Sequence, residues 1–406
     1  MSKTHIAVKY RIYPNTEQIA FFQKTFGCCR FVYNMMLTIQ KELYDRNKLH
    51  LNKYDSYTFM TSELKSRFSF LKEADSLALM NSCFDLDDAY SRFFKGETGF
   101  PKFKSRKHSR LSYTTNNQNG TVSISERHIK LPKAGKIRAK IHRNIGNAVL
   151  KSATVSQDRN GKYYCSVLFE YESAVKGKYV LSKSDAIGLD FNEKSLYVDN
   201  NGSIPSKPDT SHTLKSLGHK QRKLARMIES HIIGYKTIGN KRFPVYDKPL
   251  SECKNIQKQR KLISKIHNKA SNQRTDFLHK VSNQITNDYN LICIEDLSIK
   301  DMMSNKSKEH SAVKRRNLNR SALDNGWYMF TSMLSYKADM KGCHVVKVPK
   351  MFPSSQMCSC CGHINPMVKD LTIREWICPD CKTSHDRDIN AAINILNKEY
   401  EMYTNQ

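Results

Sequence analysis

The stretch Cys358-Ser-Cys-Cys361 is followed, sixteen residues later, by Cys378-Pro-Asp-Cys381 and then by His385-Asp-Arg-Asp388-Ile-Asn-Ala-Ala392. Two Cys-x-x-Cys pairs at this separation are typical of a tetrahedral zinc site, in which each short loop supplies two thiolates. We therefore expect one structural Zn2+ held by Cys358, Cys361, Cys378 and Cys381. A buried disulfide pair or a chance spacing is the alternative. The pattern predicts a four-cysteine zinc ribbon inserted into a larger domain.

Two acids, Asp386 and Asp388, follow the ribbon at the start of an Ala-rich helical segment. A carboxylate at a helix N-terminus commonly caps the free backbone N–H groups or interacts with the helix dipole. The same acids are also free to bind a cation and take part in chemistry. The ribbon therefore reads as an element that presents an acid to an active site.

Two further acids lie in apolar segments that are typical of strands. Asp190 ends Ile-Gly-Leu-Asp, and Glu295 ends Ile-Cys-Ile-Glu. A carboxylate is costly to bury unless it is paired or binds a cation. Each acid alone could be a strand end facing water, so the functional interpretation depends on their acting together with Asp388.

Together, Asp190, Glu295 and Asp388 suit hydrolysis of a phosphodiester. Acids from two strands and a helix can hold two Mg2+ ions roughly 3.5–4 Å apart, one to activate the attacking water and one to stabilise the leaving 3′ oxygen. Oxygen ligands favour Mg2+ or Mn2+, in contrast to the sulfur site. These three residues are our predicted catalytic and metal-binding set.

The charge of the chain indicates a polyanionic partner. Its 406 residues carry 67 Lys and Arg against 38 Asp and Glu, a formal net charge of +29. Nucleic acid is the expected partner. A membrane surface is the competing one, but no apolar run approaches the roughly 18 residues of a membrane span. The start of the chain has no apolar signal-peptide core, so the twelve cysteines indicate a reducing, cytoplasmic location.

The chain alternates between strand-like and helical segments. Residues 1–14 read as a strand, 15–98 as helices and 99–174 as a small β-domain that the first strand completes. A linker at 175–184 precedes an α/β domain at 185–354, which contains a long helical hairpin at 214–284 interrupted near Gly234–Pro249. The ribbon occupies 355–383, and a last acidic motif with its helix occupies 384–406.

Two basic segments are predicted to contact nucleic acid. The helical hairpin carries roughly four times as many Lys and Arg as acidic residues, and a single-sign bias marks interaction surfaces. The alternative is that the basic residues of the hairpin only face solvent and bind no partner. The second segment is an aromatic-punctuated loop whose basic residues are Lys102, Lys104, Arg106, Lys107 and Arg110.

Nearly the whole chain resembles the TnpB family of transposon-encoded, RNA-guided nucleases, compact relatives of type V CRISPR effectors. The two Cys-x-x-Cys pairs and His385-Asp-Arg-Asp388-Ile-Asn-Ala-Ala392 are the most specific motifs. The others are Tyr10-Arg-Ile-Tyr-Pro14, Phe26-Gly27, Arg30-Phe-Val-Tyr-Asn34, Gly99-Phe-Pro-Lys-Phe-Lys-Ser-Arg106, Leu131-Pro-Lys133, Gly188-Leu-Asp190, Ile294-Glu-Asp-Leu297 and Phe352-Pro-Ser-Ser355.

The resemblance implies an α/β multidomain protein with an RNase H-like (RuvC) nuclease domain that holds the inserted zinc ribbon. It implies a β-barrel wedge-like domain with an inserted helical recognition lobe. The family's three acidic motifs map onto Asp190, Glu295 and Asp388, the last chosen over Asp386 because it precedes x-Asn-Ala-Ala.

The implied function is RNA-guided cleavage of double-stranded target DNA beside a short recognition motif. The implied partners are a guide RNA derived from the transposon end and the target DNA, with a monomer as the expected state. Two alternatives stay open: a guide-dependent repressor that binds without cutting, and a transposase that acts directly on transposon ends. The second is weakened because no His-x-His pair flanked by apolar residues lies near a tyrosine.

Overall fold

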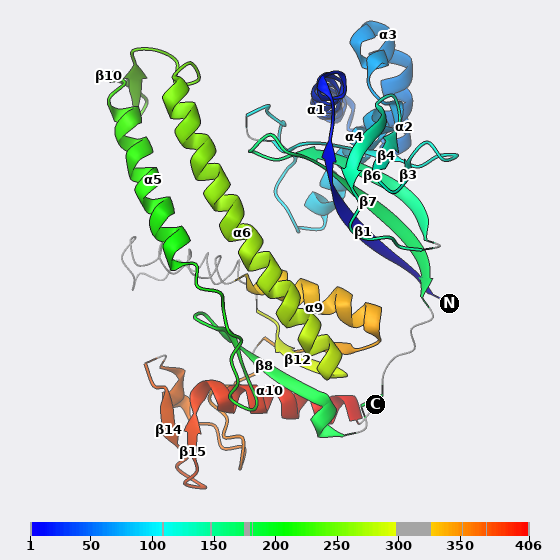
Figure 1. Cartoon of the computed structure of the whole chain (residues 1–406). Coiled ribbons are helices and arrows are strands. Elements are labelled where there is room, and N and C mark those ends of the chain that lie inside the picture. Colours follow the sequence, from blue (N-terminus) through cyan, green and yellow to red (C-terminus); the bar gives the residue numbers. More distant parts are fainter. Residues whose placement is uncertain are drawn as a thin grey trace. The chain divides into compact units, whose positions relative to one another are not determined.

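The computed structural model describes residues 2–107, 109–146, 148–173, 179–180, 182–297, 326–350, 352–370 and 372–404. The chain divides into two compact units, Met1–Ala174 and Val175–Gln406. Both combine helices with a sheet (Figure 1). Most of the expected linker at 175–184 lies outside the described residues.

The first unit is built on an antiparallel sheet in the order β2-β6-β7-β1-β5-β4-β3. The first strand, β1 (Ser2–Tyr13), lies in its interior and pairs with both β5 and β7. The N-terminal strand is therefore part of the same sheet as the strands of residues 111–173. The other strands are β2 (Leu111–Asn116), β3 (Ser123–Ile124), β4 (His128–Leu131), β5 (Gly135–Lys140), β6 (Val149–Gln157) and β7 (Tyr163–Ser173).

The β6–β7 turn forms at Asp158-Arg-Asn-Gly161, a sequence whose residue types are typical of turns. The Asp158 carboxylate accepts hydrogen bonds from the backbone N–H groups of Asn160 (2.9 Å) and Lys162 (2.8 Å). Gly161 has a φ of 78°, a conformation that glycine adopts without steric cost. The pairings leave β2 and β3 at the ends of the sheet, so closure into a barrel stays a prediction.

The helices between β1 and β2 pack against this sheet and share its core. Asn15 caps α1 in a capping box: its side chain accepts from the Gln18 N–H at 2.8 Å, and the Gln18 side chain accepts from the Asn15 N–H at 3.1 Å. Phe22 of α1 meets Tyr113 of β2. The helical elements are α1 (Thr16–Asn47), α2 (Lys53–Phe59), the π-helical turn η1 (Met60–Leu64), α3 (Lys65–Arg67), the 3-10 turn η2 (Ser69–Glu73) and α4 (Ser76–Phe94).

The second unit contains a mixed sheet in the order β13-β12-β8-β9. The strands β8 (Ala186–Asn192), β12 (Leu291–Glu295) and β13 (His344–Val348) are parallel, whereas β9 (Leu196–Asp199) runs antiparallel to β8. Parallel strands need helical cover on both faces, which explains their nearly continuous apolar sequence.

Alternate residues of these strands enter two different cores. Ile187 and Ile292 pack in one core with Leu278 of α6 (Lys254–Asp288) and with Trp327 of α9 (Trp327–Lys341). Ala186, Leu291 and Cys293 pack in the other core, with Ile395 and Leu396 of α10 (Arg387–Thr404). The sheet is thus covered by α6 and α9 on one face and by α10 on the other (Figure 1).

Gly188 shows how closely α10 approaches the sheet. A Cβ atom added to this residue would lie 2.2 Å from the Ala392 carbonyl oxygen and 2.9 Å from the Leu396 Cβ. Only glycine allows this approach, which sets the position of the helix that follows the last acidic motif.

The helical hairpin forms an arm of the second unit, residues 211–288. It consists of α5 (Ser211–Glu229), β10 (Ile232–Ile238), β11 (Lys241–Tyr246) and α6. The interruption predicted near Gly234–Pro249 contains the antiparallel β10–β11 hairpin, at the end of the two helices (Figure 1).

The ribbon, residues 355–383, is a small element with its own core of Cys358, Val368, Trp376 and Cys378. Its strand β14 (Glu375–Ile377) pairs with β15 (Ser384–Asp386), which leads directly into α10. Within the described residues, no helix has the length and apolar character needed to cross a membrane.

Candidate functional site

The sheet register brings the first two predicted acids to the same edge. Leu189 of β8 lies opposite Ile294 of β12, and each is followed by one of the acids, Asp190 and Glu295. Because parallel neighbouring strands end at the same edge, the two carboxylates belong to one site. Both are partly buried.

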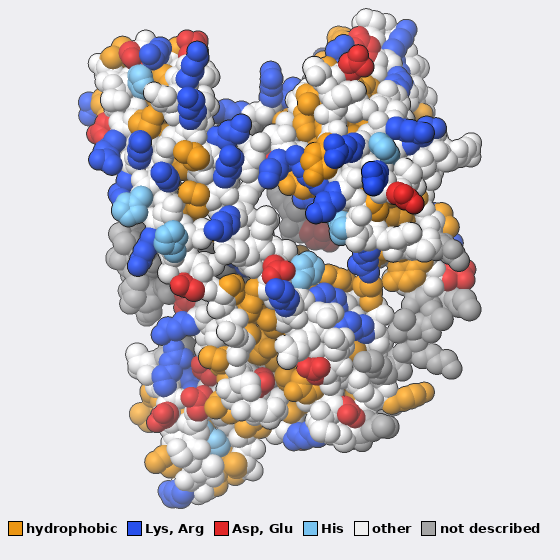
Figure 2. Space-filling model, viewed as in Figure 1, with side chains coloured by type: hydrophobic (Ala, Val, Ile, Leu, Met, Phe, Trp, Pro, Cys, Tyr) orange, Lys and Arg blue, Asp and Glu red, His pale blue; other side chains and the backbone are white. Residues whose placement is uncertain are grey.

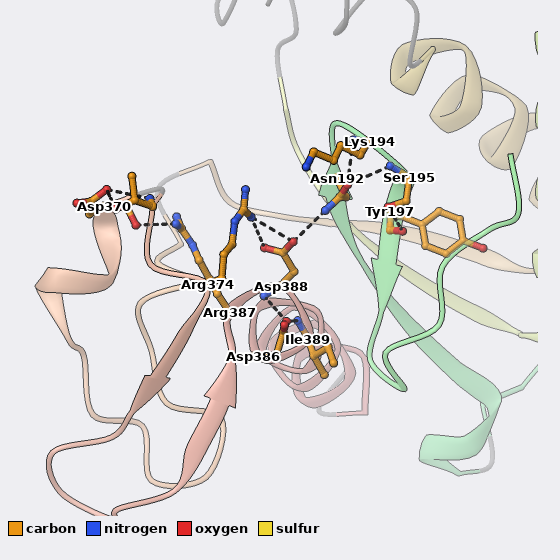
Figure 3. Close-up of polar contacts among 11 residues, drawn as sticks. Asn192, Lys194, Ser195, Tyr197, Asp370, Arg374, Asp386, Arg387, Asp388 and Ile389 are labelled. Atoms are coloured by element: carbon orange, nitrogen blue, oxygen red, sulfur yellow. Dashed lines mark hydrogen bonds and ion pairs between the residues drawn. The ribbon is translucent and has the colours of Figure 1, made fainter. Parts of the chain in front are cut away.

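The third acid reaches this site from the first turn of α10. The Asp386 carboxylate accepts hydrogen bonds from the N–H groups of Asp388 and Ile389, each at 2.9 Å, and therefore fulfils the capping role. Asp388 is left to point toward β8, where its side chain is 22% exposed (Figure 3). The two acids of this motif thus have different structural roles.

Three polar partners of the acids were not found from the sequence. The Asn192 amide donates to Asp388 at 2.9 Å, and the Ser354 hydroxyl donates to Glu295 at 2.8 Å. Arg374 of the ribbon lies 3.4 Å from Asp388 (Figure 3). Of the three, only Asn192 could have been suspected from the sequence, because it lies two residues beyond Asp190 on the same strand.

A tight turn fixes the orientation of the Asn192 side chain. Its carbonyl oxygen accepts from the backbone N–H groups of Lys194 and Ser195, each at 3.0 Å. The amide nitrogen is therefore left to face Asp388, as Figure 3 shows. The turn between β8 and β9 thus holds the acid on α10 in place.

The three carboxylates repel one another. Burial, followed by the negative charges of Glu295 and Asp388, raises the pKa of Asp190 well above its usual value. Burial also raises the pKa of Glu295, an effect that the hydrogen bond from Ser354 partly opposes. A bound cation would relieve this repulsion, and an all-oxygen donor set fits Mg2+ or Mn2+.

The four predicted zinc ligands also come together. The sulfur atoms of Cys358, Cys361, Cys378 and Cys381 all lie within 4.8 Å of one another. The Cys358–Cys381 and Cys361–Cys378 separations are 3.5 and 3.6 Å. Zn–S bonds of about 2.3 Å in a tetrahedron place sulfur atoms about 3.8 Å apart, so the cluster fits one zinc ion. The disulfide alternative is wrong, because all four cysteines are free.

His385 is a further contact of the cluster that the sequence did not indicate. Its Nε2 atom lies 3.0 Å from the Cys358 sulfur, and its ring packs on Trp376. With Cys360 and Cys358 it forms a second group of potential metal ligands.

Two asparagines of α10 tie the ribbon to the acidic site. Asn390 donates to the Met357 carbonyl at 2.7 Å and accepts from the Ser359 N–H at 2.9 Å. Asn394 donates to the carbonyls of Ser354 at 2.8 Å and Met357 at 2.6 Å. The same helix therefore positions Asp388, the first cysteine loop and the serine that contacts Glu295.

The predicted basic loop lies in the first unit. Lys104 is held there by the protein itself: Asn34 pairs with its backbone N–H and C=O, and its ammonium lies 3.7 Å from the centre of the Tyr33 ring and 3.6 Å from Asp85. Lys102, Arg106, Lys107 and Arg110 are exposed. Lys104 and Arg110 line a cavity of about 200 Å3 with residues of α1, α4 and β2.

Three family models match parts of the chain. A model described as "Probable transposase" matches residues 168–306, and a Cas12f1-like TNB domain model matches residues 327–395. A helix-turn-helix model matches residues 1–48, where the structure has the strand β1 and the single long helix α1.

The chain is also similar to known proteins over nearly its full length. The "Putative RNA-guided DNA endonuclease" of Streptomyces pristinaespiralis is 30% identical over 404 residues, covering 98% of this chain and 90% of that protein. The "Putative RNA-guided DNA endonuclease InsQ" of Escherichia coli (strain K12) is 30% identical over 401 residues, with coverages of 96% and 91%.

The fold is similar to that of Cas12f1 in a complex with single guide RNA and target DNA. The TM-score is 0.59 at 14% identity, and the match covers 98% of this chain and 99% of that one. Because relatives that are 30% identical cover nearly the entire sequence, this protein belongs to the TnpB family.

Proposed function

We propose that this protein is an RNA-guided DNA endonuclease of a transposable element. The observation that carries the proposal is the convergence of Asp190, Glu295 and Asp388 at one edge of the β8–β12 sheet. The names of its relatives and its net charge of +29 support nucleic acid as the substrate.

The three carboxylates would hold divalent cations, Mg2+ or Mn2+. Bound ions would activate water and stabilise the leaving 3′ oxygen of the cut strand. Ser354 and Asn192 orient the carboxylates of Glu295 and Asp388, and Arg374 adds a positive charge beside Asp388. The protein's own contribution is this fixed arrangement of negative oxygen atoms.

The finer assignments belong to the same proposal. Residues 185–354 and 384–406 form the RuvC-like nuclease domain, which the mixed sheet of three parallel strands and one antiparallel strand supports. Residues 355–383 bind one structural Zn2+. In the first unit, the β-domain is wedge-like and the helices of 15–98 form the recognition lobe. The partners are a guide RNA from the transposon end and target DNA with a short adjacent motif, bound by a monomer.

Cleavage by the purified ribonucleoprotein tests the proposal. The RNA that copurifies with the chain is sequenced, and a plasmid matching its guide segment is incubated with the complex and Mg2+. We expect cutting that requires Mg2+, the matching target and the RNA, and that is lost in Asp190→Ala. Binding of the matched plasmid without cutting by the wild type would favour the repressor alternative. Cutting that survives RNase treatment would favour a transposase.

A further inference from the structure

The arm formed by α5, β10, β11 and α6 carries an exposed basic face that the acidic site does not use. Across residues 211–288, Lys and Arg outnumber Asp and Glu more than threefold. Figure 2 shows Lys and Arg side chains spread along both of its helices. A solvated surface would mix the two signs more evenly, so this bias favours an interaction surface.

The basic residues of α6 are arranged in a line. Five exposed lysines recur at intervals of three or four residues and so lie on one face of the helix. In the described part of the chain, none of them has an acidic side chain within ion-pair distance. We call this face the lysine stripe: Lys254, Lys258, Lys261, Lys265 and Lys269.

The length of the stripe fits the backbone of a nucleic-acid duplex. The fifteen residue-to-residue steps from Lys254 to Lys269 span about 22 Å. A duplex carries phosphates along both edges of each groove, so a stripe of this length can lie beside several of them. Lysine supplies a point charge and reads no base, so these contacts would not depend on sequence.

The β10–β11 hairpin at the end of the arm exposes apolar and aromatic side chains. Ile233 is 69% exposed, Tyr235 54% and Ile238 59%. Two strands alone have no core, so these side chains need a partner. Arg242 lies over the Tyr235 ring at 4.4 Å, which makes a flat cationic and aromatic surface suited to stacking on an unpaired base.

We propose that the arm binds a stem-loop of RNA, with the stem phosphates along the lysine stripe and an unpaired loop base on the Tyr235–Arg242 pair. This inference rests on the proposed function, in which an RNA is the permanent partner. A stem-loop offers a duplex and unpaired bases next to each other, whereas double-stranded DNA offers only the first. α6 begins beside the hairpin, so the stripe starts where the stacking surface lies (Figure 1).

The test measures binding by the full-length chain after bound nucleic acid is removed at high salt. The probes are an RNA hairpin with a stem of about ten base pairs, the same stem as a blunt RNA duplex, and a DNA hairpin of the same sequence. Affinity is measured between about 50 and 300 mM salt. All variants also carry Asp190→Ala, so that cutting cannot affect the result.

For the stripe, we compare replacement of all five lysines by glutamine with replacement by arginine. Glutamine keeps helix propensity and removes charge, whereas arginine keeps both. In the glutamine variant, the slope of log affinity against log salt should become shallower on either RNA probe, by about one for each phosphate contact that is lost. The arginine variant should keep the wild-type slope. An unchanged slope in the glutamine variant would overturn the inference.

For the hairpin, Tyr235→Ala should weaken binding of the RNA hairpin about tenfold, without changing its salt slope or the affinity for the blunt duplex. Tyr235→Phe is the matched control and should bind as the wild type does. The proposal would be contradicted if Tyr235→Ala weakened binding of the blunt duplex as much as binding of the RNA hairpin. It would also be contradicted if the wild type bound the DNA hairpin as tightly as the RNA hairpin. None of these results depends on cleavage, so failure of the nuclease proposal is detected separately.

Discussion

The side-chain amide of Asn192 donates a 2.9 Å hydrogen bond to the carboxylate of Asp388, although 196 positions separate the two residues in the chain. One residue belongs to a strand–turn–strand and the other to the first turn of α10. The bond joins the first and last acidic motifs directly, so the geometry of the proposed active site depends on it.

Asn192→Ala should therefore slow cleavage without preventing RNA binding. A hydrogen bond to a charged group contributes about 1.5–3 kcal/mol, which corresponds to a rate loss of about ten- to a hundredfold if the contact persists in the reaction. Single-turnover cutting of a matched plasmid measures the effect. Asn201→Ala, an asparagine beyond β9, is the control and should retain the wild-type rate. A wild-type rate in Asn192→Ala would show that the contact is dispensable.

Asp190→Asn should stabilise the metal-free protein while abolishing cleavage. Because burial and two neighbouring carboxylates raise the pKa of Asp190 in the folded state, the native protein binds more protons than the unfolded chain between about pH 4 and that raised pKa. Stability contributed by this group therefore falls as pH rises through its folded pKa. At pH 8 in EDTA, we expect the variant to have a Tm higher by roughly 2–4 °C.

Mg2+ should reverse the order of the Tm values of the wild type and Asp190→Asn. The cation should raise the Tm of the wild type, since it relieves the repulsion among the carboxylates, and should have a smaller effect on Asp190→Asn. Equal effects of Mg2+ on both proteins would contradict binding at Asp190.

Cys378→Ser should lose the zinc ion and reduce the thermal stability of the second unit. Removing one of four thiolates leaves the tetrahedral site open and weakens the metal-dependent fold of the ribbon. Cys253→Ser is the control, because its thiol lies outside both groups of potential metal ligands. Zinc content per chain, measured by elemental analysis, should fall only in the first variant.

Gly188→Ala should displace α10 and reduce both stability and cleavage. The added Cβ would lie 2.2 Å from the Ala392 carbonyl oxygen, and overpacking of this kind costs about 1–3 kcal/mol or more. Denaturant unfolding gives the loss of stability. Gly234→Ala is the control, since no atom lies within 4 Å of its added Cβ. Similar destabilisation by both substitutions would show that backbone entropy, and not the close approach, explains the result.

Lys337→Met should change how stability depends on pH. Burial lowers the pKa of Lys337 from 10.5 to about 8, so the unfolded chain binds the proton more tightly than the folded protein. Stability contributed by this residue is lowest below pH 8 and rises between pH 8 and 10.5. The free energy of unfolding of the wild type should therefore increase relative to Lys337→Met between pH 7 and 9.5. If the free energy of unfolding depended on pH in the same way in both proteins, the lowered pKa of Lys337 would be refuted.

The sequence predicted the elements that follow local rules. Asn15 with Gln18, and Asp158 with Gly161, lie where capping and turn rules place them. The four cysteines of the proposed zinc site could be grouped from the sequence because two short Cys-x-x-Cys loops at this separation can bring their thiols together. The acids were grouped by their apolar surroundings, and the register of β8 with β12 accounts for their meeting.

The partners of the acids could not be predicted, because they depend on tertiary contacts. Ser354 contacts Glu295 across 59 positions, and Arg374 meets Asp388 only after the ribbon folds back on α10. The role of Asp386 as the cap was also open, since both acids of the motif lie at the start of the helix. The β10–β11 hairpin was missed because its sequence carries the same Lys-rich bias as the flanking helices.

The interior position of β1 determines the order in which the first unit can be completed during translation. This strand leaves the ribosome before its partners β5 and β7, which are made more than a hundred residues later. The apolar faces of α1 and α4 emerge before the sheet that covers them exists. Such high contact order slows folding and exposes the growing chain to aggregation. The sheet of the first unit therefore cannot be completed until β7 has been made.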